Sequence, residues 1–249
     1  MDNALVVTEL RGTVLRIAFN RANKKNALTM AMYELLTAAL AQAASDDKVR
    51  SVLFLGSPGV FTAGNDIGDF MQHPPTSEDT PVVRFLTALM SFDKPMVAAV
   101  DGPAVGIGTT MLLHCDVVLA SDRARFHMPF TKLGLVPEAA ASVLVPALVG
   151  RQRAAAWLML SRPFDVKEAH AAGLVSRIVA EAELDAAAEE IGAEIAALPA
   201  EAVRLTRQLL KAGTASLVDE AMKRELVLFR ERLTAPETME AFMAFMSKR

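Results

Sequence analysis

The stretch FTAGNDI, residues 61–67, decides how this sequence folds, because it stands where a strand gives way to a helix. It follows a continuous apolar run at residues 51–56, which predicts a buried strand. A small residue, a glycine and an Asn-Asp pair after a strand predict a sharp turn into a helix. Such a turn leaves backbone N–H groups free, and free N–H groups can bind a developing oxyanion. Taken alone, the stretch is more typical of an ordinary strand-to-helix loop.

A second stretch of the same build lies further along the chain. DGPAVGIGTT, residues 101–110, follows the apolar run 95–100 and leads into apolar helical residues. Two such bends after two neighbouring strands can bring two N–H donors together. The pair resembles the oxyanion-hole segments of the enoyl-CoA hydratase/isomerase (crotonase) superfamily, and the resemblance runs from about Ala4 to the C-terminus.

The resemblance implies an α/β fold, a crotonase-like spiral of strand-strand-helix turns with a C-terminal helical appendage. The pattern agrees: a hairpin is predicted around Gly12, strands at 115–120 and 124–128, and helices from Glu138 onward. We place a boundary near Leu198, with an acyl-CoA-binding core at 1–198 and a helical oligomerisation region at 199–249. The family further implies a homotrimer or dimer of trimers, with Phe242 near a neighbour's CoA site.

Composition excludes several classes of function. The chain has 249 residues, 52% of them hydrophobic, so a substantial core is expected. A net charge of −3 and the lack of a basic stripe argue against binding to nucleic acid. Cys115 is the single cysteine, so neither an intrachain disulfide nor a cysteine metal cluster is expected, and no metal site is predicted. We find no signal peptide and no membrane span, and we therefore expect a cytoplasmic protein without a membrane partner.

By similarity to the family, the oxyanion donors are the backbone N–H groups of Asn65 and Ile107. Relatives often carry alanine at the first position and glycine at the second. A backbone donor survives a change of side chain, so the site can stand. The bulkier side chains here are expected to narrow the pocket or change its polarity.

The candidate base is Glu138. Thr110 and Phe130 occupy the positions at which hydratases of the family carry their two catalytic glutamates, so a two-carboxylate addition of water is not available. Glu138, in GLVPE, resembles the single carboxylate of the enoyl-CoA isomerases of the peroxisomal type and their bacterial relatives. The alternative is a charge in the first turn of a helix, favoured there by the helix dipole.

These residues predict an enoyl-CoA isomerase that shifts a double bond from the 3 to the 2 position by a single-base proton transfer. Two alternatives remain: a hydratase-type or other crotonase-family enzyme, and a non-catalytic acyl-CoA-binding protein. The expected partner is an acyl-CoA thioester substrate, and no separate cofactor is expected because coenzyme A is part of that substrate. Residues expected to contact it are Lys24, Ala63, Gly64, Asp66, Ile67, Gly106, Thr110, Phe130 and Phe242.

Several of these residues also have simpler interpretations. Asp66 suits a helix cap and Lys24 suits a solvated loop. His114 is interpreted as a core histidine, whereas His127 can line the pocket. The charged run that contains Glu225 predicts a solvated or intersubunit helix face.

Overall fold

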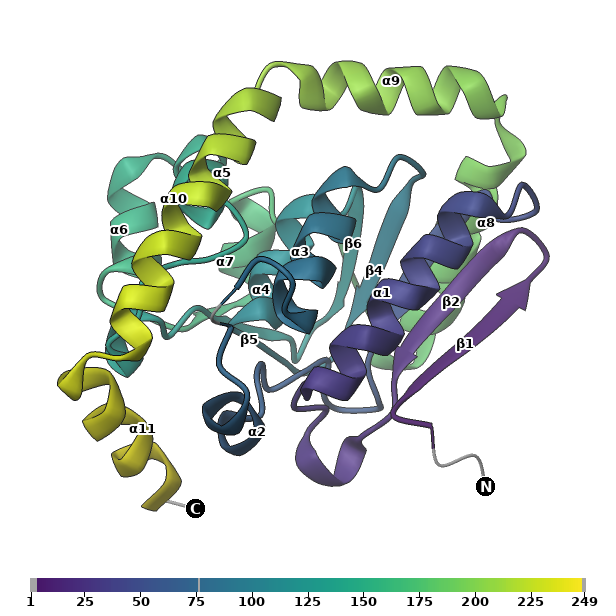
Figure 1. Ribbon diagram of the computed structural model, residues 1–249. Coiled ribbons are helices and arrows are strands. Elements are labelled where there is room, and N and C mark those ends of the chain that lie inside the picture. The colour runs from purple at the N-terminus through teal and green to yellow at the C-terminus, as the bar shows by residue number, and fades with distance from the viewer. Residues whose placement is uncertain (1–3, 76, 248–249) are drawn as a thin grey trace.

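The structure, a computed structural model, describes residues 4–75 and 77–247 and centres on a six-stranded sheet. The sheet has the order β1-β2-β3-β4-β6-β9, with an antiparallel β1–β2 hairpin at its edge (Figure 1) and parallel pairing elsewhere. The predicted hairpin is therefore confirmed, and Gly12 at its turn has φ +59°. The strands are β1 (Val6–Arg11), β2 (Val14–Phe19), β3 (Ser51–Leu55), β4 (Met96–Val100), β6 (Val117–Ser121) and β9 (Arg177–Val179).

Both faces of this sheet are covered, which explains why its parallel strands are apolar without interruption. Val52 and Phe54 of β3 pack into the main core with α1 (Met30–Ser45) and α3 (Pro81–Ser91). Leu53 and Leu55, which alternate with them, pack on the opposite face with α8 (Leu184–Ala197).

A second, three-stranded sheet completes the spiral. It contains β5 (Pro103–Val105), β7 (Arg125–His127) and β8 (Phe164–Asp165). Each of the central strands β4 and β6 is followed by one of these short strands and then by a helical turn, so the predicted order of strand, strand and helix is confirmed. β5 and β8 were not predicted, because strands of three and two residues show no alternation.

Helices make up most of the remaining chain. Thr29 caps α1 as predicted, since its side chain accepts a hydrogen bond from the N–H of Met32. No helix in the described ranges has the length and apolar composition of a membrane span. The remaining elements are α2 (Ile67–Gln72), α4 (Ile107–Thr110), α5 (Ala141–Val149), α6 (Arg151–Leu158), α7 (Val166–Ala171), α9 (Ala200–Ala212), α10 (Ala215–Leu233), α11 (Pro236–Ser247) and the 3₁₀ turns η1 (Ala22–Lys24), η2 (Met111–His114), η3 (Thr131–Leu133) and η4 (Glu181–Glu183).

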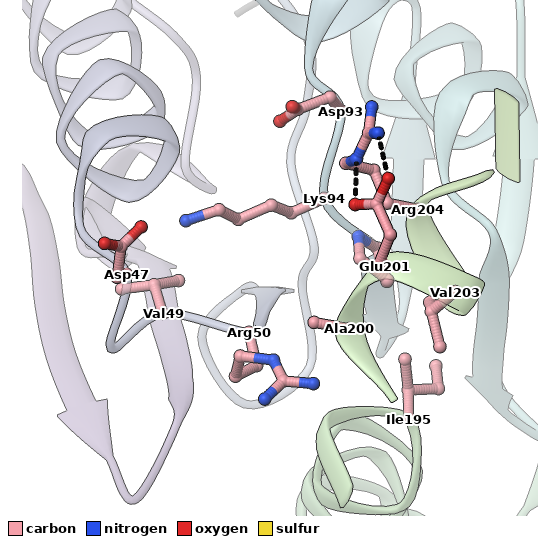
Figure 2. Close-up of a pocket in the computed structure, with 11 residues that line it drawn as sticks. Asp47, Val49, Arg50, Asp93, Lys94, Ile195, Ala200, Glu201, Val203 and Arg204 are labelled. Atoms are coloured by element: carbon pink, nitrogen blue, oxygen red, sulfur yellow. Dashed lines mark hydrogen bonds and ion pairs between the residues drawn. The ribbon is translucent and has the colours of Figure 1, made fainter. Parts of the chain in front are cut away.

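α9 crosses from α8 to α10 along one edge of the molecule (Figure 1). Beneath its first turn lies a hollow of about 150 Å³ lined largely by charged side chains. Several of these charges already have partners: Glu201 pairs with Arg204, as Figure 2 shows, and Lys94 Nζ donates to two backbone carbonyls. The hollow is therefore a poor candidate for a functional site. The boundary at Leu198 falls between α8 and α9, and the division into two regions remains a prediction.

One buried side chain anchors α9 to the core. Arg207 is 5% exposed, and its Nε donates to the carboxylate of Asp116 at 2.7 and 2.8 Å. Its Nη1 donates to the carbonyl oxygen of Phe92, and its Nη2 to that of His114 at 3.5 Å. A single guanidinium thus joins α9 to the residues that flank β4 and β6.

Replacing this anchor tests its contribution to stability. We expect Arg207→Met to lower the free energy of unfolding by about 3 kcal/mol, because Asp116 loses its cation and two carbonyls lose their donor. Urea titration at fixed protein concentration measures the change. The control is Arg204→Met on the same helix, whose exposed pair with Glu201 contributes little. Equal midpoints for the two variants would contradict the assignment.

Candidate active site

The first bend, residues 61–67, is held by buried polar groups from the loop before α1. Asn26 is fully buried, and its Nδ2 donates to the carbonyl oxygens of Val60 at 3.1 Å and Phe61 at 3.0 Å. In return, the Thr62 hydroxyl donates to the carbonyl oxygen of Asn26 at 2.6 Å. The loop therefore serves as a rigid support for the backbone that leads to Asn65.

The two bends lie directly against each other. The N–H of Val105 donates to the carbonyl oxygen of Thr62 at 3.0 Å. Gly64 has φ +83°, and a Cβ placed there would lie 2.7 Å from the carbonyl oxygen of Val105. Glycine is thus required at this position by both its backbone conformation and the close approach of the second bend.

The second bend ends in a helix start that leaves an N–H free. Gly106, with φ +56°, donates its own N–H to the carbonyl oxygen of His127 at 2.8 Å. α4 begins at Ile107, whose N–H has no acceptor earlier in the helix. Within the part of the chain that the structure describes, neither the N–H of Ile107 nor that of Asn65 has a hydrogen-bond acceptor.

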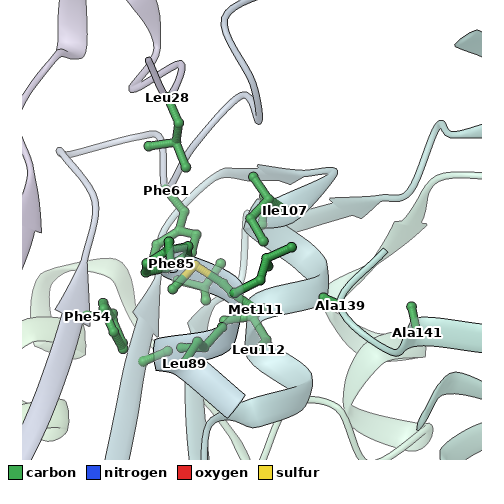
Figure 3. Close-up of a cluster of buried hydrophobic side chains, with 14 of the residues drawn as sticks. Leu28, Phe54, Phe61, Phe85, Leu89, Ile107, Met111, Leu112, Ala139 and Ala141 are labelled. Carbon is green, nitrogen blue, oxygen red and sulfur yellow. The ribbon is translucent and has the colours of Figure 1, made fainter. Parts of the chain in front are cut away.

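A buried apolar cluster fixes these bends from below. Ile107 is 1% exposed and belongs to the same cluster as Phe61, Phe85 and Met111, which Figure 3 shows gathered beside it. The large side chain at position 107 therefore packs into the core. It also forms part of the cavity wall.

Both bends open into a cavity of about 500 Å³, large enough for an acyl group. Its walls are mainly apolar. Nine of the residues proposed from the sequence line it: Ala63, Gly64, Asn65, Ile67, Gly106, Ile107, Phe130, Glu138 and Phe242.

Glu138 is the one acidic residue that lines the cavity, counting the lining residues in the described ranges. Its side chain is buried, with 7% of the residue exposed. Burial and, to a smaller extent, the charge of Glu225 raise the pKa of Glu138 to about 7, although a 3.4 Å hydrogen bond from the Thr110 hydroxyl opposes the rise. A carboxyl group with this pKa can accept and return a proton near neutral pH.

The turn that follows Glu138 is unusual and strongly restrained. Ala139 and Ala140 both have φ +57°, a conformation that costs free energy for residues with a Cβ. The carbonyl oxygen of Ala139 accepts a hydrogen bond from His114 Nε2 at 2.9 Å. Both carboxylate oxygens of Glu225 accept backbone N–H groups, from Ala140 at 2.7 Å and from Ser142 at 2.8 Å. Residues from η2 and α10 thus fix the backbone next to the candidate base.

Glu225 corrects one sequence prediction. Its charged neighbours predict a solvated or intersubunit helix face, yet Glu225 is 5% exposed. The free N–H groups at the start of α5 satisfy its carboxylate and allow the burial. His114 is a buried core histidine, as predicted, and burial lowers its pKa to about 4.

Three proposed residues do not line the cavity. Lys24 is exposed on η1. Asp66 caps α2 through hydrogen bonds from the N–H groups of Gly68 and Asp69, and it pairs with Arg21 at 2.7 Å. Thr110 is buried behind the wall and contacts Glu138. Capping, the simpler interpretation of Asp66, is confirmed.

The structure adds aromatic walls that sequence reasoning did not assign. Phe70 of α2, Phe229 of α10 and Phe245 of α11 all line the cavity. These residues occur along their helices at the same spacing as core residues, so the sequence alone does not distinguish them from the core. Phe242 is 2% exposed in the wall of this chain's own cavity, and its place near a neighbour's CoA site, which the resemblance implies, stays a prediction.

Comparison with known proteins identifies the family of this chain. The family model described as enoyl-CoA hydratase/isomerase matches residues 9–249. Enoyl-CoA delta isomerase 2 of Rattus norvegicus is 35% identical over 251 residues, which cover 98% of this chain and 63% of the rat protein. The chain thus spans less than two thirds of that relative's length.

Solved structures match closely as well. The structure of Pseudomonas aeruginosa OdaA has a TM-score of 0.95 at 42% identity, with 97% of this chain and 98% of that chain covered. An enoyl-CoA hydratase/isomerase from Pseudoalteromonas atlantica T6c has a TM-score of 0.94 at 41% identity, with 99% and 98% covered. The crotonase-like α/β fold is therefore confirmed, and the chain belongs to the enoyl-CoA hydratase/isomerase family of enzymes.

Proposed function

We propose that this enzyme is an enoyl-CoA isomerase that moves a carbon–carbon double bond from the 3 to the 2 position of an acyl-CoA thioester. The observation that carries the proposal is that Glu138 is the single carboxylate lining the cavity, within the described residues. Thr110, behind the wall, and Phe130, in the wall, occupy the sequence positions of the two glutamates that hydratases of the family carry. One base is sufficient for a 1,3 proton shift. Similarity to the rat relative, an enoyl-CoA delta isomerase, supports the same reaction.

The chemistry follows from the arrangement of groups. Ionised Glu138 removes a proton from the α carbon, between the thioester carbonyl and the double bond. Electrons move onto the carbonyl oxygen, and the N–H groups of Asn65 and Ile107 stabilise the resulting enolate. Loss of one such donor typically costs ~3–4 kcal/mol of barrier stabilisation. Protonated Glu138 then returns the proton to the γ carbon, which leaves the double bond in conjugation with the carbonyl.

Glu138→Gln tests the base. Because the amide keeps the size of the side chain but cannot accept the proton, we expect isomerisation of 3-enoyl-CoA to fall by roughly 10²–10⁴-fold. Binding of a saturated acyl-CoA, measured by calorimetry, should persist. The control is Glu231→Gln on the exposed side of α10.

The substrate panel for this experiment includes assays of hydration and of thioester hydrolysis. The proposal requires that isomerisation is the main activity of the parent enzyme and that Glu138→Gln removes it. A parent that only hydrates, or only binds, would refute the proposal in favour of the hydratase-type or the non-catalytic alternative. If Glu138→Gln isomerises the substrate as fast as the parent, Glu138 is not the base, and its role is that of a charge near the start of a helix.

The dependence of the rate on pH tests the surroundings of the base. Since only the ionised carboxylate abstracts a proton, kcat/KM should rise as pH increases through about 7, the pKa of Glu138. In Glu225→Gln, the loss of a neighbouring negative charge should lower the pKa of Glu138 and move this rise to lower pH. Glu231→Gln should leave it in place. An unmoved profile in Glu225→Gln would show that Glu138 does not sense the charge of Glu225.

We also propose that the enzyme assembles as a trimer or a dimer of trimers through its C-terminal helices. Leu209 and Leu210 of α9 are 76% and 79% exposed, and Met243 of α11 is 54% exposed. Large apolar side chains exposed to this extent favour association.

Light scattering after size exclusion tests the assembly at micromolar concentration. We expect a mass at least three times the 26.7 kDa of one chain. The double substitution Leu209→Glu with Leu210→Glu should lower it, because two charges would enter the contact surface. A parent protein that elutes with the mass of a single chain would rule the assembly out.

A further inference from the structure

Asn65 carries a second hydrogen-bonding group besides the backbone N–H already described. Its side-chain oxygen, Oδ1, accepts a hydrogen bond from the Tyr33 hydroxyl at 2.5 Å. Tyr33 is fully buried on α1, so it is a fixed partner. Burial and then the nearby charge of Glu138 raise the pKa of Tyr33 well above its usual value. The phenol therefore stays protonated and donates a hydrogen bond. In the structure, the phenol thus holds the oxygen end of the Asn65 amide.

The nitrogen of the amide, Nδ2, therefore faces away from Tyr33. It has no acceptor within residues 4–75 and 77–247. Among the described residues, the buried side-chain atoms without a hydrogen-bond partner are nitrogens of Arg16 and Arg230. Nδ2 of Asn65 is therefore not enclosed by the protein. Asn65 lines the 500 Å³ cavity and is partly exposed, so a ligand bound there can meet an N–H donor that has no acceptor among the described residues.

The lining of the cavity is mainly apolar, and its other side chains with hydrogen-bonding groups are those of His127, Lys132 and Glu138, counting the described residues. Ile67, Phe70, Ile107 and Phe130 line the same cavity and offer no side-chain hydrogen bond. In a mainly apolar pocket, a few placed polar groups determine which ligands are selected. A ligand atom that accepts a hydrogen bond from Nδ2 would therefore gain affinity that a hydrocarbon chain cannot.

The covalent geometry of one residue limits where that ligand atom lies. The backbone nitrogen and Nδ2 of an asparagine are separated by four bonds, so they lie roughly 3–5 Å apart. If the thioester oxygen binds the backbone N–H, Nδ2 reaches the first few carbons of the acyl chain. The thioester sulfur is about as close to the carbonyl oxygen, but it is common to all acyl-CoA thioesters and gives no selection among acyl chains.

We propose that the Asn65 amide, held by Tyr33, is a specificity determinant that favours acyl-CoA thioesters with an oxygen acceptor, hydroxyl or oxo, on an acyl carbon close to the carbonyl. This inference rests on the proposed binding of the thioester between the two bends. It adds a substrate class, an oxygenated acyl chain, to the proposed isomerase.

Binding of three saturated or unreactive probes tests the inference: butyryl-CoA, 3-hydroxybutyryl-CoA and acetoacetyl-CoA. The parent enzyme should bind at least one oxygenated probe about 10-fold more tightly than butyryl-CoA, as one additional hydrogen bond would give. Asn65→Ala keeps the backbone N–H but lacks the amide, and its preference should fall to within about 2-fold. Asn65→Asp keeps the shape but replaces the donor by an acceptor, and it should lose the preference as well.

Tyr33→Phe provides a third variant that leaves Asn65 intact. It frees the amide to rotate, so the preference should weaken although the cavity keeps its size. Circular dichroism and thermal unfolding check that each variant is folded, and any one folded variant is sufficient for the test.

The outcomes separate the two proposals. Equal affinity of the parent for all three probes would overturn this inference and leave the isomerase proposal standing. A loss of affinity in Asn65→Ala that is the same for all probes would also overturn it, because the amide would then contact the shared thioester. Failure of the parent to bind any probe would refute both.

Discussion

Two hydrogen bonds, from the N–H groups of Ala140 and Ser142 to the carboxylate of Glu225, connect the C-terminal helices to the turn beside Glu138. The turn needs this restraint because Ala139 and Ala140 occupy a left-handed conformation, at a cost of roughly 1–3 kcal/mol each. The same contact brings a second negative charge close to the candidate base. The position of Glu138 and its affinity for a proton therefore have a common structural origin.

This arrangement places two carboxylates in the interior, which is costly unless each is compensated. Glu225 is compensated by backbone donors, whereas Glu138 has one long contact with Thr110. Burial raises the pKa of both carboxyl groups, but the N–H groups of Ser142 and Ala140 oppose the rise for Glu225, whereas the pKa of Glu138 rises to about 7. Glu138 can therefore exchange its proton near neutral pH, while Glu225 supports the turn.

The sequence was sufficient for the parts of the fold that depend on long, regular patterns. β3 and β4 are continuous apolar runs, and Thr29 and Gly12 mark a helix start and a hairpin turn by local chemistry. β5 and β8 escaped prediction because their pairing partners, and not their own residues, make them strands. Family resemblance gave the bends and Glu138, which the structure places along one cavity.

The remaining parts of the site depend on contacts between distant segments, which a linear pattern does not encode. Glu225 lies in a run of charged residues and is buried only because free N–H groups of another helix face it. Tyr33 has the spacing of a core residue, and its hydroxyl gains a role only when α1 packs beside Asn65. Phe229 and Phe245 could be assigned to the cavity only after α10 and α11 had been placed.

The placement of these last helices has a consequence for biosynthesis. A ribosome makes the two bends and Glu138 well before Phe229 and Phe242, which complete the wall of the cavity. At ~5–20 residues per second, the interval between Glu138 and Phe242 is roughly 5 to 20 s. During that time the nascent chain exposes an apolar, half-built cavity and lacks the carboxylate that restrains the turn. Chaperones could therefore bind this apolar surface until α10 and α11 are synthesised and cover it.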